Sequence, residues 1–187
     1  MPHTSMVSTT ERSQWINYIY GPAGSMKTSS VYDLYGRRNV FAADFGSSFP
    51  FDGYAGEPVL LVDDFRSPFV FNELLRVLDR YPLRLNIKGG HTWACWTKVV
   101  ISANVSLEEQ YPNLSERKDP LLRRFEHGIV FEKTNPEVAL PYASREAAMK
   151  GVRDDGGVPG VPGYTPMWKR EQNTAGFSDS DFDVLLQ

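Results

Sequence analysis

Short apolar runs and apolar–polar alternation recur along residues 15–131, and they predict the strands of a sheet. Five segments carry these patterns, at residues 15–20, 39–42, 58–62, 99–104 and 129–131. Residues 15–20 alternate, whereas residues 58–62 and 99–104 are almost continuously apolar, as in parallel strands that are covered on both faces. The pattern therefore predicts an α/β fold with a central parallel sheet flanked by helices.

Helical signals lie between and after these strands. Residues 29–36 are expected to form a helix that a glycine closes. Residues 71–78 place Phe and Leu side chains at helical spacing, and the Tyr-Pro pair that follows at 81–82 stops this helix. Residues 120–126 are expected to form a short helix, and residues 137–152 can form one more.

A β-hairpin with a basic outer face is predicted at residues 83–96. Residues 83–88 alternate between apolar and polar side chains, Gly89-Gly90 is a turn signal, and residues 91–96 return as the partner strand. The side chains available to a nucleic acid on this hairpin are those of Arg84, Lys88 and His91.

The chain carries no acidic residue between Arg80 and Leu107. A basic hairpin with aromatic neighbours suits a single nucleic-acid strand, through phosphate contacts and stacking on Trp93. A solvated basic face beside two core tryptophans, Trp93 and Trp96, is an equally compatible interpretation.

A glycine-rich loop connects the first strand to the first helix. It consists of Gly21, Pro22, Ala23, Gly24, Ser25, Met26, Lys27 and Thr28. A strand, a glycine-rich turn and Lys-Thr at a helix start are typical of a phosphate-binding loop, in which the lysine reaches the phosphates and the hydroxyl holds Mg²⁺. Met26 stands where that pattern has glycine, at a cost of about 1–3 kcal/mol of backbone strain. A Gly-Pro turn before an ordinary helix is the simpler alternative.

Polar residues follow two of the buried strands. Asp63 and Asp64 end the run at 58–62, where Asp63 would hold the metal and Asp64 would polarise an attacking water. Asn104 ends the run at 99–104, where it would orient that water and sense the γ-phosphate. The alternatives are an acidic cap on a structural strand and an Asn that caps the following segment.

Two adjacent arginines, Arg123 and Arg124, lie in the short helix expected at residues 120–126. An arginine that one subunit presents to the γ-phosphate of a neighbour contributes strongly to catalysis. Adjacent residues on a helix point in different directions, so at most one of the two should fill this role.

Composition and charge divide the chain into three parts. The 187 residues allow one sizeable α/β domain at 15–133, after a polar segment at 1–14 that we expect to be flexible. Basic and acidic residues balance up to residue 133, so the net charge of −3 belongs to residues 134–187. That segment contains a Gly- and Pro-rich linker and an acidic–hydrophobic end, and we expect it to be largely disordered.

The remaining composition narrows the protein class. A single cysteine, Cys95, excludes an intramolecular disulfide and favours a reducing compartment. No apolar run approaches the roughly 20 residues of a membrane-spanning helix, so no membrane partner is expected.

Taken together, these motifs resemble the helicase domain of replication initiator (Rep) proteins of circular single-stranded DNA viruses, most nearly the circovirus-like group. The motifs occur in matching order: Gly-Pro-x-Gly-x-x-Lys-Thr at 21–28, Phe-Asp-Gly-Tyr-x-Gly at 51–56, Val-Leu-Leu-Val-Asp-Asp-Phe at 59–65, Asp-Arg-Tyr-Pro-Leu at 79–83, Lys-Gly-Gly at 88–90, Val-Ile-Ser-Ala-Asn at 100–104 and Arg-Arg at 123–124.

This resemblance implies a superfamily 3 helicase with an AAA+-like P-loop NTPase fold. The resemblance implies that the protein uses ATP and Mg²⁺, assembles as a hexameric ring and moves along single-stranded DNA. By motif position, Lys27 and Thr28 correspond to the Walker A pair, and Asp63 and Asp64 to Walker B.

The later motifs extend the same correspondence. Lys88 would lie in the DNA-contacting hairpin, Asn104 would be the sensor, and Arg123 or Arg124 would be the arginine finger. The family also implies a nuclear location in the host cell and, as partners, further copies of the chain or a full-length Rep.

Two departures from the family pattern separate the functional hypotheses. Met26 puts ATP turnover in question, and the histidines at 3, 91 and 127 cannot form the His-x-His motif of the Rep nicking endonuclease. None of the tyrosines has a lysine three residues later, so we expect no nicking or joining of DNA from this chain, whether it is a fragment of a longer Rep or a standalone relative.

The first hypothesis is an ATP-dependent DNA helicase or translocase module that lacks the nicking domain. The second is a protein with weakened ATPase activity that binds single-stranded DNA or assembles with Rep. A phosphate-loop kinase of a small molecule is a weaker third hypothesis, because it leaves the basic hairpin unexplained.

Overall fold

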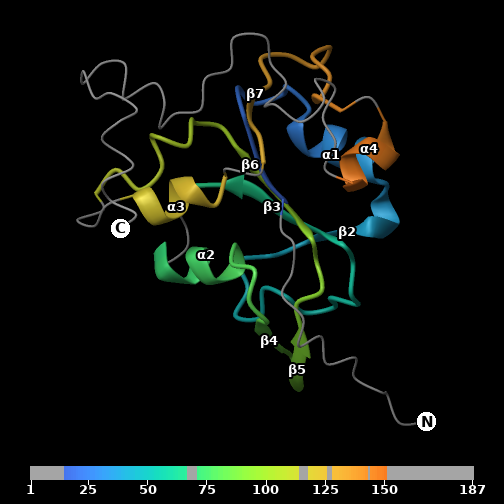
Figure 1. Ribbon diagram of the computed structural model, residues 1–187, viewed down its shortest axis with the longest axis vertical. Coiled ribbons are helices and arrows are strands. Elements are labelled where there is room, and N and C mark those ends of the chain that lie inside the picture. Colours follow the sequence, from blue (N-terminus) through green and yellow to red (C-terminus); the bar gives the residue numbers. More distant parts are fainter. Residues whose placement is uncertain (1–14, 67–70, 114–117, 126–127, 143, 151–187) are drawn as a thin grey trace, which may run out of the picture.

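The structure is a computed structural model that describes residues 15–66, 71–113, 118–125, 128–142 and 144–150 (Figure 1). A five-stranded parallel sheet forms its centre, in the order β2-β3-β6-β1-β7. The strands are β1 (Trp15–Tyr20), β2 (Val40–Ala42), β3 (Val59–Phe65), β6 (Lys98–Ala103) and β7 (Val130–Glu132). The predicted α/β fold with a central parallel sheet is confirmed.

The two most apolar strands lie inside the sheet, as their sequence predicts. All six residues of β6 are buried, and so are the first four of β3. Their side chains alternate between two hydrophobic clusters, one on each face of the sheet: Leu60 and Val62 belong to one cluster, Val59 and Leu61 to the other. Burial on both faces explains why these segments are continuously apolar.

Helices cover both faces of the sheet (Figure 1). Helix α2 (Phe71–Val77) contributes to the cluster that contains Leu60, whereas α1 (Lys27–Tyr35) and α4 (Arg145–Lys150) contribute to the opposite one. A 3-10 turn, η1 (Arg37–Asn39), and a short helix, α3 (Asp119–Arg123), complete the described elements. Helix α1 begins two residues before the predicted residue 29, because the helical turn starts directly after Met26.

The packed unit extends beyond residue 133, the predicted domain boundary. The Tyr142 hydroxyl donates a hydrogen bond to Asn17 Oδ1 over 3.1 Å, and the Arg145 guanidinium donates to the carbonyl of Leu34 at the end of α1. Ala148 of α4 is fully buried. Residues 134–142 and 144–150 therefore belong to the same unit as the sheet, so the boundary at 133 is corrected.

Of the helix expected at residues 137–152, the part of the chain that the structure describes is helical over α4. Before α4, residues 134–138 form an irregular loop around the buried Lys133 side chain. The Lys133 ammonium donates to the carbonyls of Asn135, Pro136 and Val138 in this loop. The segments 1–14 and 151–187, which carry the predicted flexible start, linker and acidic end, lie outside the described residues. Among the helices that the structure describes, none is long and apolar enough to cross a membrane.

The predicted hairpin forms a separate two-stranded antiparallel sheet, β4 (Arg84–Ile87) and β5 (Gly90–Trp93), which lies away from the central sheet in Figure 1. Its turn is Lys88-Gly89 rather than the predicted Gly89-Gly90, because Ile87 pairs with Gly90. Gly89 has a φ of 81°, a conformation that glycine adopts without steric cost.

Candidate functional site

The glycine-rich loop lies at the carboxyl end of β1, next to the carboxyl ends of β3 and β6. Gly21 passes so close to the end of β7 that a Cβ at this position would lie 2.1 Å from the Lys133 carbonyl oxygen. Gly24 has open space around it but a φ of 82°, which favours glycine. The two glycines therefore have different roles: one allows close packing and the other allows the turn.

The Lys27 side chain folds back into the loop and is only 8% exposed. Its ammonium donates to the carbonyls of Gly21 and Pro22, each over 2.9 Å, and to Asn104 Oδ1 over 3.1 Å. A fourth acceptor, Ser25 Oγ, lies 3.5 Å from the same nitrogen, so all three protons of the ammonium group are engaged. Burial lowers the pKa of Lys27, and the nearby Asp63 and Asp64 carboxylates oppose that effect.

Asp63 joins the loop to two strands through one carboxylate oxygen. Its Oδ1 accepts hydrogen bonds from the Thr28 hydroxyl over 2.6 Å, from the buried Ser102 hydroxyl, and from the Asp64 amide over 3.0 Å. Within the part of the chain that the structure describes, no hydrogen bond to Oδ2 is recorded. Asp63 is therefore fixed in orientation and keeps one oxygen for a ligand.

A β-bulge sets the positions of the two acids. Val62 pairs with Ile101 and Phe65 with Ala103, so β3 contains one more residue than β6 across this step. The extra residue is accommodated by Asp64, whose φ of 47° is in the left-handed region. Both acids are therefore exposed at the strand end, although a regular strand would point them to opposite faces.

Asn104 connects the lysine with the second acid. While its Oδ1 accepts from Lys27, its Nδ2 donates to Asp64 Oδ1 over 3.2 Å. Arg66 pairs with the same carboxylate, with 3.1 Å between its Nη2 and Asp64 Oδ2. The side chain of Arg66 is 70% exposed and that of Asp64 59%, so this ion pair orients the carboxylate more than it stabilises the fold.

The donor set at this edge fits Mg²⁺. Thr28 offers hydroxyl lone pairs, because its proton points to Asp63, and Asp63 offers its second oxygen. Among the described residues, no group of three or more His, Cys, Asp or Glu side chains could hold a metal by itself. Mg²⁺ characteristically binds one or two protein oxygens and completes its shell with water and phosphate oxygens.

Met26 adopts the conformation that the loop pattern reserves for glycine. Its φ is 61° and its ψ is 35°, and its side chain is 51% exposed. A side chain in this region costs about 1–2 kcal/mol, because Cβ approaches the following carbonyl oxygen. The strain expected from the sequence is therefore located at one residue whose side chain packs little.

Met26→Gly is expected to raise the free energy of unfolding by about 1 kcal/mol, since it removes the strained Cβ at little loss of packing. Thermal or urea denaturation measures the change. Ser29→Gly, at an exposed position within α1, is the matched control and should lower stability by about 0.5–1 kcal/mol. If both variants were destabilised alike, the strain at Met26 would be refuted.

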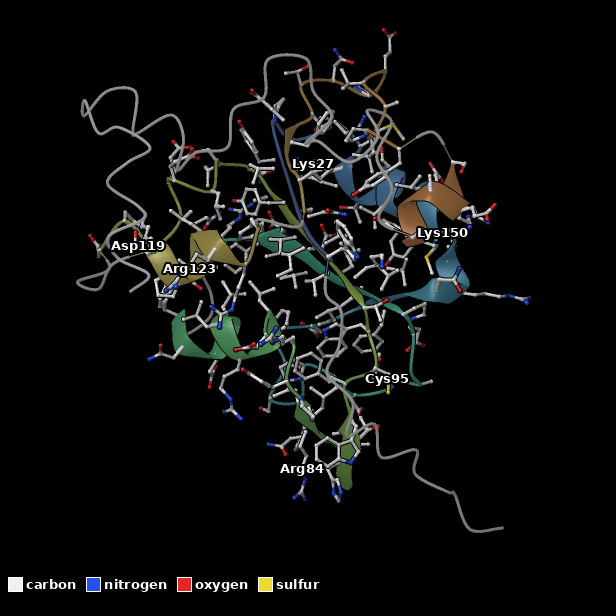
Figure 2. The ribbon with its side chains drawn as sticks, viewed as in Figure 1. Lys27, Arg84, Cys95, Asp119, Arg123 and Lys150 are labelled. Carbon is white, nitrogen blue, oxygen red and sulfur yellow. The ribbon has the colours of Figure 1, made fainter. Side chains whose placement is uncertain are left out.

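The structure distinguishes the two adjacent arginines. Arg124 donates to Asp79 Oδ2 over 2.9 Å and to the carbonyls of Leu75 and Pro120, which ties α3 to the end of α2. Arg123 is exposed, and it lies well apart from Lys27 of the same chain (Figure 2). Arg124 thus has a structural role within the chain, which leaves Arg123 as the candidate for a contact with a neighbouring subunit.

The hairpin collects its predicted residues on one face. Arg84 pairs with Trp93 and Asn86 with His91 across the two strands, so these four side chains project to the same side. Arg84 Nη2 lies 3.0 Å from His91 Nδ1. Lys88 is exposed at the turn. On the opposite face, Leu85 is buried against the core and anchors the hairpin.

Three residues in this region have contacts that the sequence did not indicate. They are Ser102, which orients Asp63; Arg66, which pairs with Asp64; and Asp52, which accepts a hydrogen bond from the Lys88 amide. Of these three contacts, the sequence gives a sign of one. Ser102 is a small polar residue inside an apolar strand, which indicates a specific partner for its hydroxyl.

The class of proteins to which this chain is similar is the viral replication-associated proteins. The chain is 31% identical over 128 residues to the replication-associated protein of goose circovirus, which covers 66% of this chain and 42% of that protein. It is 33% identical over 110 residues to that of beak and feather disease virus, which covers 59% of this chain and 36% of the relative.

A replication-associated protein of a human-associated cyclovirus matches at 25% identity over 123 residues, 63% of this chain and 43% of that protein. No protein-family model matches the chain. The chain thus spans less than half the length of these curated relatives. The resemblance to circovirus-like Rep proteins that its motifs predict is confirmed.

Proposed function

We propose that this chain is the ATP-dependent DNA helicase or translocase module of a viral-type replication initiator. The observation that supports this most directly is the connected set of Lys27, Asn104 and Asp64, joined by hydrogen bonds at the carboxyl edge of a parallel sheet. Ligands of open α/β sheets bind at this edge. The similarity to circovirus Rep proteins supports the same proposal.

In this proposal the loop of residues 21–28 is a P-loop of the AAA+-like type. Its backbone amides and the start of α1 face the triphosphate, and phosphate oxygens replace the Gly21 and Pro22 carbonyls as acceptors for the Lys27 ammonium. Thr28 and Asp63 would hold Mg²⁺, which would neutralise charge that develops on the phosphates.

Asn104 and Asp64 are the residues proposed to position and activate the attacking water. Their side chains already touch, and the Lys27 ammonium fixes the orientation of the Asn104 amide. Asp64 accepts a proton of the water through its carboxylate, and Asn104 positions that water relative to the γ-phosphate. Arg66 holds Asp64 in place from the solvent side.

Single-stranded DNA is the proposed partner of the hairpin. Lys88 at the turn and Arg84 and His91 on the outer face offer cationic and polar groups to phosphates, and Trp93 on the same face offers a ring to a base. The assembly proposed is a ring of six copies, or a joint assembly with full-length Rep, in the nucleus of the host cell.

Lys88→Ala is expected to weaken binding of single-stranded DNA and to reduce the slope of log K against log salt by about 0.7, because one phosphate contact is lost. Fluorescence anisotropy at several salt concentrations measures both quantities. Lys150→Ala is the control, since Lys150 is an exposed lysine that pairs with Glu146 on α4 and lies far from the hairpin (Figure 2). An unaltered slope in Lys88→Ala would place the DNA surface elsewhere.

The left-handed conformation of Met26 favours a second candidate function. If strain in the loop prevents turnover, the chain is a protein that binds single-stranded DNA or assembles with Rep without hydrolysing ATP. This candidate keeps the effect of Lys88→Ala on DNA binding, but it predicts that nucleotide hydrolysis is absent with and without DNA.

A further inference from the structure

The turn at Phe51–Tyr54, in the connection between β2 and β3, touches the hairpin at two places. Asp52 Oδ1 accepts a hydrogen bond from the backbone amide of Lys88, over 3.1 Å. The Tyr54 hydroxyl accepts one from the backbone amide of Cys95, over 3.0 Å. One short turn therefore contacts both the tip of the hairpin and the segment just after its second strand.

Aromatic packing fixes the same turn to the core. The Phe51 ring stacks on Trp96 with 5.7 Å between centroids and 21° between planes, and the Tyr54 ring meets Trp96 edge-on at 5.4 Å. Trp96, which follows the hairpin and precedes β6 in the sequence, is completely buried. The turn is thus anchored to the core beside the base of the hairpin.

The backbone of the turn explains its glycine. The Tyr54 amide donates to the Phe51 carbonyl over 3.1 Å, which closes a four-residue β-turn. Gly53, the third residue, has a φ of 82°. Each residue of the sequence Phe-Asp-Gly-Tyr therefore has a contact or a conformation that its type provides.

A two-stranded hairpin is marginally stable unless other parts of the protein support it. In addition, a carboxylate next to Lys88 repels DNA phosphates, so charge alone would disfavour an acid at position 52. An acid at position 52 is explained if it contributes by geometry rather than by charge. Its carboxylate holds the turn from which the Lys88 side chain extends.

We propose that Asp52 is a positioning residue for the DNA-binding hairpin, holding the Lys88-Gly89 turn so that the Lys88 ammonium meets a DNA phosphate. This role rests on the proposed binding of single-stranded DNA by the hairpin. Asp52 acts only through the Lys88 backbone and touches no DNA itself.

Two substitutions separate geometry from charge. Asp52→Ala removes the acceptor and the charge, whereas Asp52→Asn removes the charge and keeps an acceptor oxygen. With a fluorescein-labelled oligo-thymidylate, Asp52→Ala should bind roughly tenfold more weakly than the wild type, and Asp52→Asn should bind as tightly or more tightly. Tighter binding by both variants, or no change in Asp52→Ala, would overturn the proposal.

The double variant shows whether the effect passes through Lys88. In a Lys88→Ala background, Asp52→Ala should cause little further loss, because the lysine that Asp52 positions is already absent. Equal losses in both backgrounds would indicate a general disturbance of the fold and overturn the proposal. Hydrogen exchange at the Lys88 amide provides a readout without DNA: Asp52→Ala should accelerate exchange there, and Asp52→Asn should not.

The outcomes also distinguish this role from the proposed function. If Lys88→Ala leaves DNA binding unchanged, the hairpin is not the DNA surface, and the proposed binding of DNA by the hairpin fails together with the role of Asp52. If Lys88→Ala weakens binding but Asp52→Ala does not, the DNA surface stands and the positioning role of Asp52 alone is refuted.

Discussion

Lys27→Ala is expected to reduce ATP affinity roughly hundredfold or more. The ammonium lies in the bend of the loop, where it donates to groups of Gly21, Pro22, Ser25 and Asn104. The proposed phosphate site depends on this buried cation. Removing one partner of a buried charged contact costs about 2–5 kcal/mol. Titration with a fluorescent ATP analogue in the presence of Mg²⁺ measures the affinity.

Lys150→Ala serves as the control for this substitution, because it removes an exposed lysine whose ion pair is with Glu146 of its own helix. A thermal unfolding curve for each variant establishes that the sheet remains folded. ATP affinity equal to that of the wild type in folded Lys27→Ala would refute the nucleotide site at residues 21–28.

Arg123→Ala is expected to reduce ATP turnover by about 10³-fold while ATP affinity changes little, as for the loss of an arginine finger. Arg123 is exposed at the end of α3 and lies away from the Lys27 of its own chain, so it reaches a γ-phosphate only across a subunit interface (Figure 2). Steady-state hydrolysis at saturating ATP gives the turnover number, and the fluorescent analogue gives the affinity.

Mixing the two inactive variants tests the shared site. A ring that contains both Lys27→Ala and Arg123→Ala chains has some interfaces where an intact loop faces an intact arginine, so activity should partly return. Arg76→Ala, at an exposed position of α2, should retain wild-type turnover. Full activity in Arg123→Ala, or no recovery on mixing, would refute the finger.

The sheet could be predicted because its central strands are buried on both faces. A strand covered on both sides has no polar face to break its apolar run, and β3 and β6 are such strands. The carboxyl ends of parallel strands share one edge of a sheet, so the sequence could place the acidic pair and Asn104 at the same edge, where Asn104 donates to Asp64.

The details of the acidic pair could not be predicted. The bulge at Asp64 depends on the register between β3 and β6, which the sequence of either strand alone does not contain. Ser102 is a short hydroxyl side chain in a buried strand, and only the paired register places it against Asp63. The orientation of both acids is therefore a tertiary property.

The same limit applies to the arginines and to the C-terminal boundary. The sequence could not say that Arg124 pairs with Asp79, because that contact requires α3 to lie against the end of α2. Nor could composition show that residues after 133 pack with the sheet, because Arg145 donates to carbonyls of α1 that are more than 100 positions away in the chain. Long-range hydrogen bonds, rather than local propensity, join these later residues to the packed unit.

The most direct test of the central claim is ATP hydrolysis by the purified chain with Mg²⁺, with and without single-stranded DNA, over a range of protein concentrations. The ATP-dependent module predicts turnover that rises with DNA and with concentration, because the site is shared between subunits that DNA brings together. Absence of turnover in both the wild type and Met26→Gly would contradict it and leave a binding protein.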